Sequence, residues 1–474
     1  MLETTSADQQ ARQAIHTLLQ QAPWASLDHL ERIRFHGEVP LLDSAHKLPV
    51  ASASAIGAFA FSVEQWWHLM HQRHQTIGID WMQATCALNP GYFQRQNGYA
   101  VPALTLLQHF KADFYRTRDD RWFFPVGGPY PLLRDGILET LACANTQTAL
   151  TEAIASWDAA DIEDAFAQRR LPGCYARTPA EWLAHPQGQW LSTQPVIQVT
   201  KIGDSTPELP IAAQRPLSGI RVLDLGHVIS GPVIARSLAE HGADVLRVSA
   251  PLMQDPVQQT MDTNIGKRSA FLDLNQTQDL AKARDLISQA DVIVQSWRPG
   301  RIAARGLGAE DAAQIRPGII YVSVSSYGDE GPWGDRGGFE QLGQAAAGVC
   351  VNEGGQGKPR LVNTYLLNDY LTGYLGAAGV MMALIRRANE GGSYHVKVSL
   401  ARTSMWTQTL GLQATYDPTA PARHFSEVLR PRLGQSQGAY GLLDQLPPVA
   451  QFSRTPARWE LPSAPTGSHL AQWL

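Results

Sequence analysis

The sequence contains few cysteines, and they form no recognisable pattern. Only Cys86, Cys143, Cys174 and Cys350 occur in 474 residues, and no two of them have the spacing of metal ligands. Four thiols in so long a chain do not make a disulfide framework, so we expect a reducing, cytoplasmic environment. The sequence therefore predicts a protein with neither structural disulfides nor a bound metal.

Two further absences narrow the class of protein. No stretch of about 18 apolar residues runs without a polar interruption, so we expect no membrane-spanning helix. No dense block of lysine and arginine is present and the net charge is −4. This argues against a nucleic-acid surface but leaves room for basic pockets that bind small anions. The first ten residues are polar and acidic, so we expect neither a signal peptide nor a transit peptide.

What the chain does contain is an ordinary globular balance, with 44% apolar and 17% charged residues. Its length predicts two to four domains. A proline-rich linker is expected over residues 206–216, and a second proline-rich segment forms a tail over residues 407–474. The remaining chain is long enough to bury sizeable cores.

An α/β fold is predicted from residue 219 onward. A buried strand over residues 219–225 is followed by a turn, a helix over 233–241 and a second strand over 245–248. This is the first module of a parallel, doubly wound sheet. Further strands are expected over 269–274, 292–295 and 319–323. No G-x-G-x-x-G motif follows the first strand, so a dinucleotide is not the natural ligand. The loop after that strand still lies where α/β sheets bind ligands.

A small α+β domain is expected over residues 111–205. Its pattern predicts helices over 132–150 and 158–170 and a short strand over 196–199. Thr178 and Glu181 form a capping box with Pro179 at the first helical position, so a helix begins there.

One acid begins a long apolar segment. Asp369 precedes residues 374–385, which are nearly free of polar side chains and predict a buried helix. Asn368 or Asp369 would lie at its N-terminus, where free N–H groups favour a carboxylate. For such an acid, a simple N-cap is the ordinary interpretation.

The same region takes part in a weak internal repeat. Residues 57–85 align without a gap on residues 376–404, at an offset of 319. Each copy consists of an apolar helix, a polar turn and an alternating strand. In this register Val50 corresponds to Asp369, so only one copy carries an acid. A shared helix–turn–strand pattern without common origin is the alternative.

From Pro216 to about Trp406 the chain resembles the class III (CaiB/BaiF-type) CoA-transferases, which include the formyl-CoA transferases. Two of the matching motifs are Trp297-Arg298-Pro299-Gly300 and Asn368-Asp369-Tyr370-Leu371-Thr372-Gly373. The others, in family order, cover residues 216–224, 230–232, 242–245, 266–269, 272–274, 290–293, 317–321, 331–332 and 344–348. So many segments at family spacing are far more specific than any single motif.

The resemblance implies a domain order. Residues 217–406 correspond to the family's Rossmann-like large domain and residues 111–205 to its small domain. Residues 1–110 resemble a degenerate half of a second large domain. Members of this family form interlocked dimers, so we expect either a homodimer or a fused monomer that imitates one.

The resemblance also implies a chemistry. Asp369 matches the family's nucleophile, which transfers CoA from an acyl-CoA to a carboxylic acid without a metal. Glu340 is a second catalytic candidate, because it could orient the acyl group. The alternative is that it only caps a helix. A glycine-rich loop assists in the family, and here only Gly127–Gly128 and the segment 354–357 are candidates. The residues expected to bind CoA are Val228, Ile229, Ser230, Arg247, Leu272, Ser296, Trp297, Arg301 and Arg305.

Departures from the family pattern keep two alternatives open. Ile229 replaces a polar residue, and Gly337 stands where the formyl-transferring branch has a lysine. A CoA-binding scaffold without activity is therefore one alternative. An α-methylacyl-CoA racemase is the other, and it ranks lower because Gly338-Phe339-Glu340 lacks the histidine of the racemase motif.

Overall fold

A computed structural model of the chain describes residues 6–26, 28–101, 109–128, 130–253 and 255–474. Part of the expected polar N-terminal segment lies outside these residues. The largest sheet has seven strands in the order β11-β10-β9-β12-β13-β14-β8, of which only β8 is antiparallel to its neighbour. The strands are β8 (Gln198–Gly203), β9 (Arg221–Asp224), β10 (Asp244–Ser249), β11 (Arg268–Phe271), β12 (Val292–Gln295), β13 (Ile320–Ser325) and β14 (Ser393–Ser399). The predicted α/β class is confirmed.

Helices cover both faces of this sheet. Val222 faces a core that includes Ile234 and Leu375, whereas the next residue, Leu223, faces a core that includes Leu286. The first face is covered by α9 (Ser230–Ala239) and α15 (Asn368–Glu390), the second by α11 (Thr277–Ser288) and α12 (Ala309–Ile315). Because both faces are buried, the strands read as continuous apolar runs.

The strand order reverses direction beside β9. After β9 the chain proceeds outward through β10 and β11, and it then returns to place β12 on the other side of β9. The loops after β9 and β12 therefore leave the sheet in opposite directions, which is the arrangement where α/β sheets usually form a ligand crevice. The predicted CoA-binding residues 228–230 and 296–297 lie on these two loops.

The internal repeat is visible in the elements. Helix α2 (Leu48–His71), strand β2 (Ile77–Asp80) and α3 (Trp81–Cys86) follow one another as do α15, β14 and α16 (Leu400–Thr409). Trp81 and Leu400, where α3 and α16 begin, are separated by the same 319 residues as the aligned segments. Helices α2 and α15 belong to one core.

Two glycines show how far the repeat extends. A Cβ added at Gly57 would meet Ile15 of α1 (Ala7–Leu18), and one added at Gly376 would meet Ile234 of α9. Gly57 and Gly376 are themselves 319 residues apart. Helix α1 therefore packs on α2 as α9 packs on α15, at a position where only glycine allows close approach.

We expect Gly376→Val to destabilise the protein by about 1–3 kcal/mol, because overpacking displaces neighbouring side chains. A Cβ at Gly376 would be 2.9 Å from Cγ1 of Ile234, with the terminal methyl closer still. Denaturant unfolding measures the change. The control is Gly91→Val, where no atom lies within 4 Å of an added Cβ. Equal stability of the two variants would contradict the close packing.

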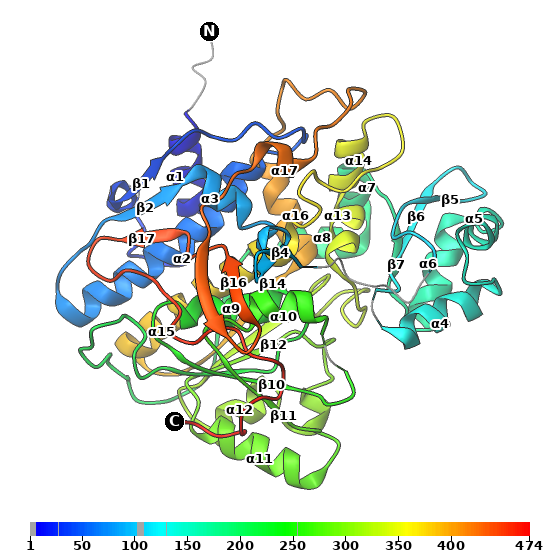
Figure 1. Ribbon diagram of the computed structural model, residues 1–474. Helices are drawn as coiled ribbons and strands as arrows, with labels where there is room; N and C mark the ends of the chain where they lie inside the picture. The colour runs from blue at the N-terminus through cyan, green and yellow to red at the C-terminus, as the bar shows by residue number, and fades with distance from the viewer. Residues whose placement is uncertain (1–5, 27, 102–108, 129, 254) are drawn as a thin grey trace.

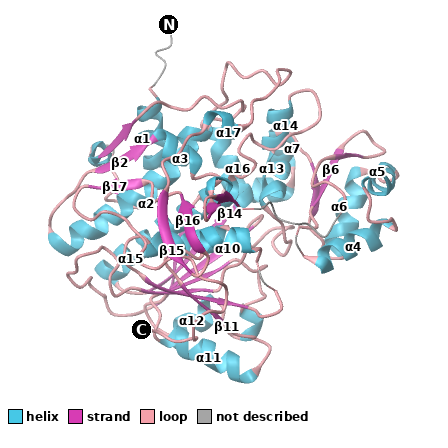
Figure 2. Cartoon of the chain, in the orientation of Figure 1, coloured by secondary structure: helices cyan, strands magenta, loops and turns pink. Residues whose placement is uncertain are grey.

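The small unit lies apart at the edge of the molecule, as Figures 1 and 2 show. It contains β5 (Tyr115–Arg116), β6 (Trp122–Pro125), β7 (Gly173–Tyr175), α4 (Pro131–Leu141), α5 (Gln147–Ala155) and α6 (Ala159–Gln168). The prediction of one helix over 132–150 is wrong, because Ala142 adopts a left-handed conformation (φ 49°) that ends α4. The capping box is confirmed. The Thr178 hydroxyl accepts from the Glu181 N–H at 3.1 Å, and the Glu181 carboxylate accepts from the Thr178 N–H at 2.7 Å.

The C-terminal segment is built into sheets formed with N-terminal residues. Strand β16 (Gly441–Gln445) pairs with β15 (Gly434–Gly438) and with β3 (Arg95–Gln96), and β3 pairs with β4 (Tyr99–Ala100). Strand β17 (Ala450–Phe452) pairs with β2, whose other neighbour is β1 (Ile33–His36). The segment over residues 407–474, which the sequence suggested as a tail, is thus an ordered part of the fold. The domain boundaries given from the sequence stay a prediction.

The remaining helices are α7 (Pro179–Ala184), α8 (Pro186–Ser192), α10 (Val257–Thr263), α13 (Glu340–Ala347), α14 (Val349–Gly354) and α17 (Phe425–Val428), with short 3₁₀ turns at His29–Arg32, Pro90–Phe93 and Ala303–Arg305. None of the helices in the described ranges is both long and apolar enough to cross a membrane.

Candidate active site

Asp369 lies in the first turn of the buried helix α15. Its side chain is nearly enclosed, and Oδ1 accepts a 2.6 Å hydrogen bond from the hydroxyl of Ser230, at the start of α9. The helix begins after Leu367, which supplies no side-chain cap. The carboxylate of Asp369 is therefore not used as the N-cap that the sequence suggested.

The N-terminus of α15 is capped from another helix. Oε2 of Glu340, the first residue of α13, accepts from the Asp369 N–H at 2.6 Å, and Oε1 accepts from the Asn368 N–H at 3.1 Å. Gln344 donates to the same Oε1 at 2.7 Å. Of the two roles considered for Glu340, these contacts are those of a cap. We therefore treat Glu340 as a positioning residue for Asp369.

Two buried carboxyl groups so close together cannot both ionise freely. Burial raises the pKa of Asp369 to about 6, with the Ser230 hydrogen bond opposing the shift. Burial and the charge of Asp369 raise the pKa of Glu340 to about 8, although its N–H donors favour the ionised form. The raised pKa values therefore favour a state in which the two carboxyl groups share a single negative charge.

We expect Glu340→Gln to remove part of the pH dependence of stability. A carboxyl group whose pKa is raised by folding stabilises the protein fully below its ordinary pKa of 4.5, and this contribution is lost as pH rises through about 8. Between about pH 5 and 8 the unsubstituted protein should therefore lose about 3 °C in melting temperature relative to the variant. Calorimetry measures this, with the exposed Glu152→Gln as control. If the melting temperatures of the two proteins changed with pH in parallel, Glu340 would already be ionised at pH 7.

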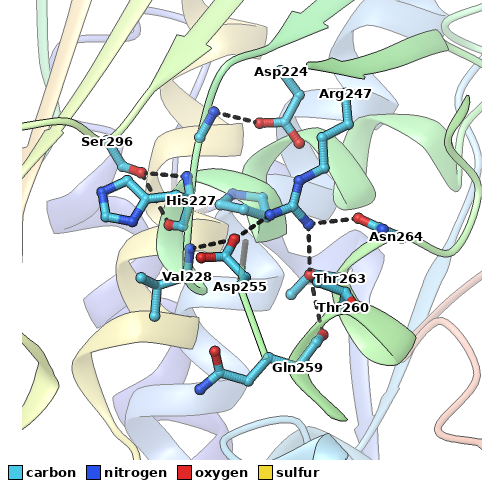
Figure 3. Close-up of polar contacts among 12 residues, drawn as sticks. Asp224, His227, Val228, Arg247, Asp255, Gln259, Thr260, Thr263, Asn264 and Ser296 are labelled. Carbon is cyan, nitrogen blue, oxygen red and sulfur yellow. Dashed lines mark hydrogen bonds and ion pairs between the residues drawn. The ribbon is translucent and has the colours of Figure 1, made fainter. Parts of the chain in front are cut away.

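The loops after β9 and β12 are tied together at the crevice. The Ser296 hydroxyl accepts from the His227 N–H at 2.9 Å and donates to the His227 carbonyl at 3.1 Å (Figure 3). The indole of Trp297 donates to the Leu225 carbonyl at 2.8 Å, and its ring lies 4.5 Å from that of His227. Val228, which follows His227 in the chain, adopts a left-handed conformation (φ 62°), which is rare for a β-branched residue.

A buried ion pair lies beneath the loop that follows β9. Nζ of Lys267 lies 2.6 Å from Oδ2 of Asp224, and neither side chain is exposed. Asp224 also accepts from the Gly226 N–H at 2.9 Å, while Lys267 donates to the Pro232 carbonyl at 2.7 Å. The pair thus connects the end of β9, the loop after it and the first turn of α9. Burial lowers the pKa of Lys267 to about 8, and Asp224 opposes this shift.

The structure places the predicted CoA-binding residues around one edge of the sheet, but not all of their side chains face outward. Ile229 packs in a core with Val233 and Tyr370. Arg247 is fully buried within β10. Arg305 lies at the periphery, where it donates to Asn275 at 2.7 Å. Leu272 belongs to the core against which Trp297 packs, and Arg301 is exposed.

Two residues at the crevice were not predicted from the sequence. Asp255 accepts from the Val228 N–H at 2.9 Å and from Arg247, and the hydroxyl of Tyr130 donates to it at 3.2 Å. Tyr130 follows the Gly127–Gly128 candidate, so the structure brings that glycine segment to the crevice. The other candidate segment packs elsewhere, with Gly355 against Pro418. The only sequence signal for Asp255 was its position before Pro256 at a helix start.

An open cleft lies beside Trp297. It has a volume of about 230 Å³ and is lined by the ends of β12, β13 and β14, with Trp190 and Arg402 on the opposite wall. Val228, Ser230 and Asp369 do not line it. Asp369 itself is buried, with 7% of its surface exposed.

Comparison with known proteins identifies the α/β part of the chain. The model of CoA-transferase family III matches residues 217–441. The acetyl-coenzyme A transferase nodX of Hypoxylon pulicicidum is 34% identical over 329 residues, which cover 64% of this chain and 55% of that protein. The succinyl-CoA–L-malate CoA-transferase beta subunit of Chloroflexus aurantiacus is 33% identical over 198 residues, or 39% of this chain and 49% of that subunit.

A solved structure, that of the hypothetical protein Rv3272 of Mycobacterium tuberculosis, has 31% sequence identity and a TM-score of 0.39, over 43% of this chain and 57% of that one. The chain spans about half the length of the relatives it matches. The resemblance carried by the sequence motifs is confirmed: residues 217–441 match the model of CoA-transferase family III.

Proposed function

We propose that the protein transfers CoA from an acyl-CoA thioester to a carboxylic acid, with Asp369 as the nucleophile. The observation that carries this proposal is the position of Asp369. It is a buried carboxylate at the N-terminus of α15, beside the crevice at the switch point of the sheet. It also falls within the segment that matches the family.

The reaction is balanced without any further reactant. An Asp369 oxygen attacks the thioester carbonyl, the C–S bond breaks, and CoA leaves as thiolate from a mixed anhydride. The thiolate attacks the aspartyl carbonyl, which releases the first acid and leaves an aspartyl thioester. The acceptor carboxylate then attacks this thioester, which releases the thiolate and forms a second mixed anhydride. The thiolate attacks the acceptor's carbonyl in this anhydride, so that the new acyl-CoA forms and Asp369 leaves as a free carboxylate. Covalent catalysis thus divides one difficult exchange into easier steps.

Each neighbouring residue has a role in this scheme. Ser230 holds the nucleophile, and Glu340 fixes the helix start from which it projects. Val228, Ser296, Trp297 and the arginines at 301 and 305 line the path of CoA. The loop that carries Gly128 and Tyr130 supplies donors to the oxyanions, a role that preorganised N–H or O–H groups perform well.

Several properties of the whole protein belong to the same proposal. We place it in the cytoplasm, with small acyl-CoA and carboxylic acid substrates, as a homodimer or a fused monomer that imitates one. The repeat of α1, α2, β2 and α3 supports the fused arrangement, because it supplies a second copy of the packing around α15 within one chain.

The test is detection of the covalent intermediate. The full chain is incubated with a panel of acyl-CoA thioesters, and mass spectrometry follows the mass of CoA on the peptide that contains Asp369. Hydroxylamine should release this adduct. Absence of any adduct across the panel would support a CoA-binding scaffold instead. Exchange of the α-hydrogen for deuterium without an acceptor would support a racemase.

A further inference from the structure

We propose that Asp255 is an internal anion that occupies the receptor for an oxyanion of the substrate, and that substrate binding displaces it. This inference rests on the proposed function, because the ligand is taken to be an acyl-CoA or its carboxylic acid partner. The receptor consists of the guanidinium of Arg247, the N–H of Val228 and the hydroxyl of Tyr130.

Three elements converge on one carboxylate. Oδ2 of Asp255 accepts from the Val228 N–H at 2.9 Å and pairs with Nη2 of Arg247 in β10. Oδ1 accepts from the Tyr130 hydroxyl of the small unit at 3.2 Å. Figure 3 shows the carboxylate of Asp255 between the Val228 amide and the Arg247 side chain. A guanidinium, an N–H and a phenol around two oxygens form a receptor for a carboxylate or phosphate.

The guanidinium of Arg247 is held in place by hydrogen bonds to two neutral side chains. Its Nη1 donates to Asn264 at 2.5 Å and to Thr263 at 3.2 Å, both neutral groups. Among the described residues, Asp255 is the one acid within ion-pairing distance of Arg247. A buried arginine charge needs an anion, and any oxyanion that replaced Asp255 would leave the balance of charge unchanged.

The backbone of the loop depends on the same contact. Val228 has a positive φ of 62°, and its N–H points at Asp255. A β-branched residue holds such a conformation only where its surroundings impose it, and these positions gather at ligand sites. The ligand that displaces Asp255 therefore finds the N–H already oriented.

The same contact is linked to the nucleophile through Tyr130. The ring of Tyr130 stacks on Phe339 at 6.2 Å, and Phe339 directly precedes Glu340, the cap of Asp369. While Tyr130 and Asp255 are joined, a substrate cannot reach the Arg247 receptor. Leu252, three residues before Asp255, is 98% exposed.

The first test is the affinity for CoA itself, which binds without reacting. If Asp255 occupies the receptor in about nine molecules of ten, its removal tightens binding about tenfold, because the apparent affinity is reduced by the fraction of competent molecules. We therefore expect calorimetric titration of Asp255→Asn with CoA to give a dissociation constant about tenfold lower. Asp244→Asn is the matched control: it removes the carboxylate that pairs with Arg268 at 2.8 Å, from the opposite end of the same strand.

The two possible sources of the oxyanion give different results. If a CoA phosphate displaces Asp255, the variant binds CoA more tightly and succinate as before. If a substrate carboxylate does so, the variant binds succinate more tightly and CoA as before. An unchanged or weaker affinity for both ligands in a folded Asp255→Asn protein would overturn the proposal.

A second measurement does not depend on altering Asp255. A fluorophore is attached at Leu252→Cys in a Cys143→Ser background, since the other three cysteines are buried. Addition of CoA or succinate should change its emission as Asp255 leaves. Binding of both ligands without any change would overturn displacement. Neither measurement involves the aspartyl thioester, so failure here and failure of the proposed transfer are distinguished.

Discussion

Asp369→Asn should reduce CoA transfer by at least about 10³-fold, because loss of the proposed covalent nucleophile removes the whole pathway rather than one contact. Asparagine keeps the volume of the side chain and can still meet the Ser230 hydroxyl, so the fold should be unaffected. The rate of exchange between acyl-CoA and a labelled acid measures the effect. The aspartyl adduct should disappear together with the activity.

Two variants separate this effect from general damage. Ser230→Ala removes the 2.6 Å hydrogen bond to Asp369 and should reduce the rate by about tenfold. Asp161→Asn alters an acid in the first turn of α6, in the small unit, and should leave the rate unchanged. Retention of transfer by Asp369→Asn, with the adduct on another residue, would assign the chemistry elsewhere.

Asp224→Asn should lower the free energy of unfolding by about 3–5 kcal/mol, because it leaves a buried lysine without its counter-ion. Both Asp224 and Lys267 are fully enclosed, and their 2.6 Å contact supports the loop that carries Val228. The loss should appear in denaturant unfolding, and CoA binding should weaken with it.

The double variant Asp224→Asn/Lys267→Met tests the cause. A neutral pair of similar size should recover part of the stability, since the uncompensated charge is gone. The exposed pair of Lys282 and Asp285, at 2.7 Å, is the matched control, and Asp285→Asn should change stability by less than about 0.5 kcal/mol. If both acids proved equally dispensable, the buried pair would not be what holds the loop.

Three contacts between charged residues share a property that explains why the sequence did not predict them. Asp255 and Arg247 are eight residues apart, Asp224 and Lys267 are 43 apart, and Glu340 and Asp369 are 29 apart. No periodicity links such positions, since each pair is made by a different crossing of strands, loops and helices. The sequence placed Lys267 and Asp224 in family motifs but did not show that they meet.

Local patterns, by contrast, were sufficient for much of the α/β part. The alternation of apolar runs and helical stripes predicted β9, α9, β10, β12 and β13 within a few residues, because burial on both faces leaves a strong local signal. The capping box at Thr178 is local for the same reason. The helix break at Ala142 is not, because an alanine in a left-handed conformation carries no sequence signal.

By itself the sequence determined the α/β class and the match of residues 217–441 to the family, and it led to the proposal of Asp369 as nucleophile; all of these depend on short segments read in order. The tertiary structure alone decided that Glu340 caps α15, that Asp255 pairs with Arg247, and that the C-terminal strands pair with N-terminal ones. These are contacts between distant parts of the chain, and their energies exist only once the fold has brought those parts together.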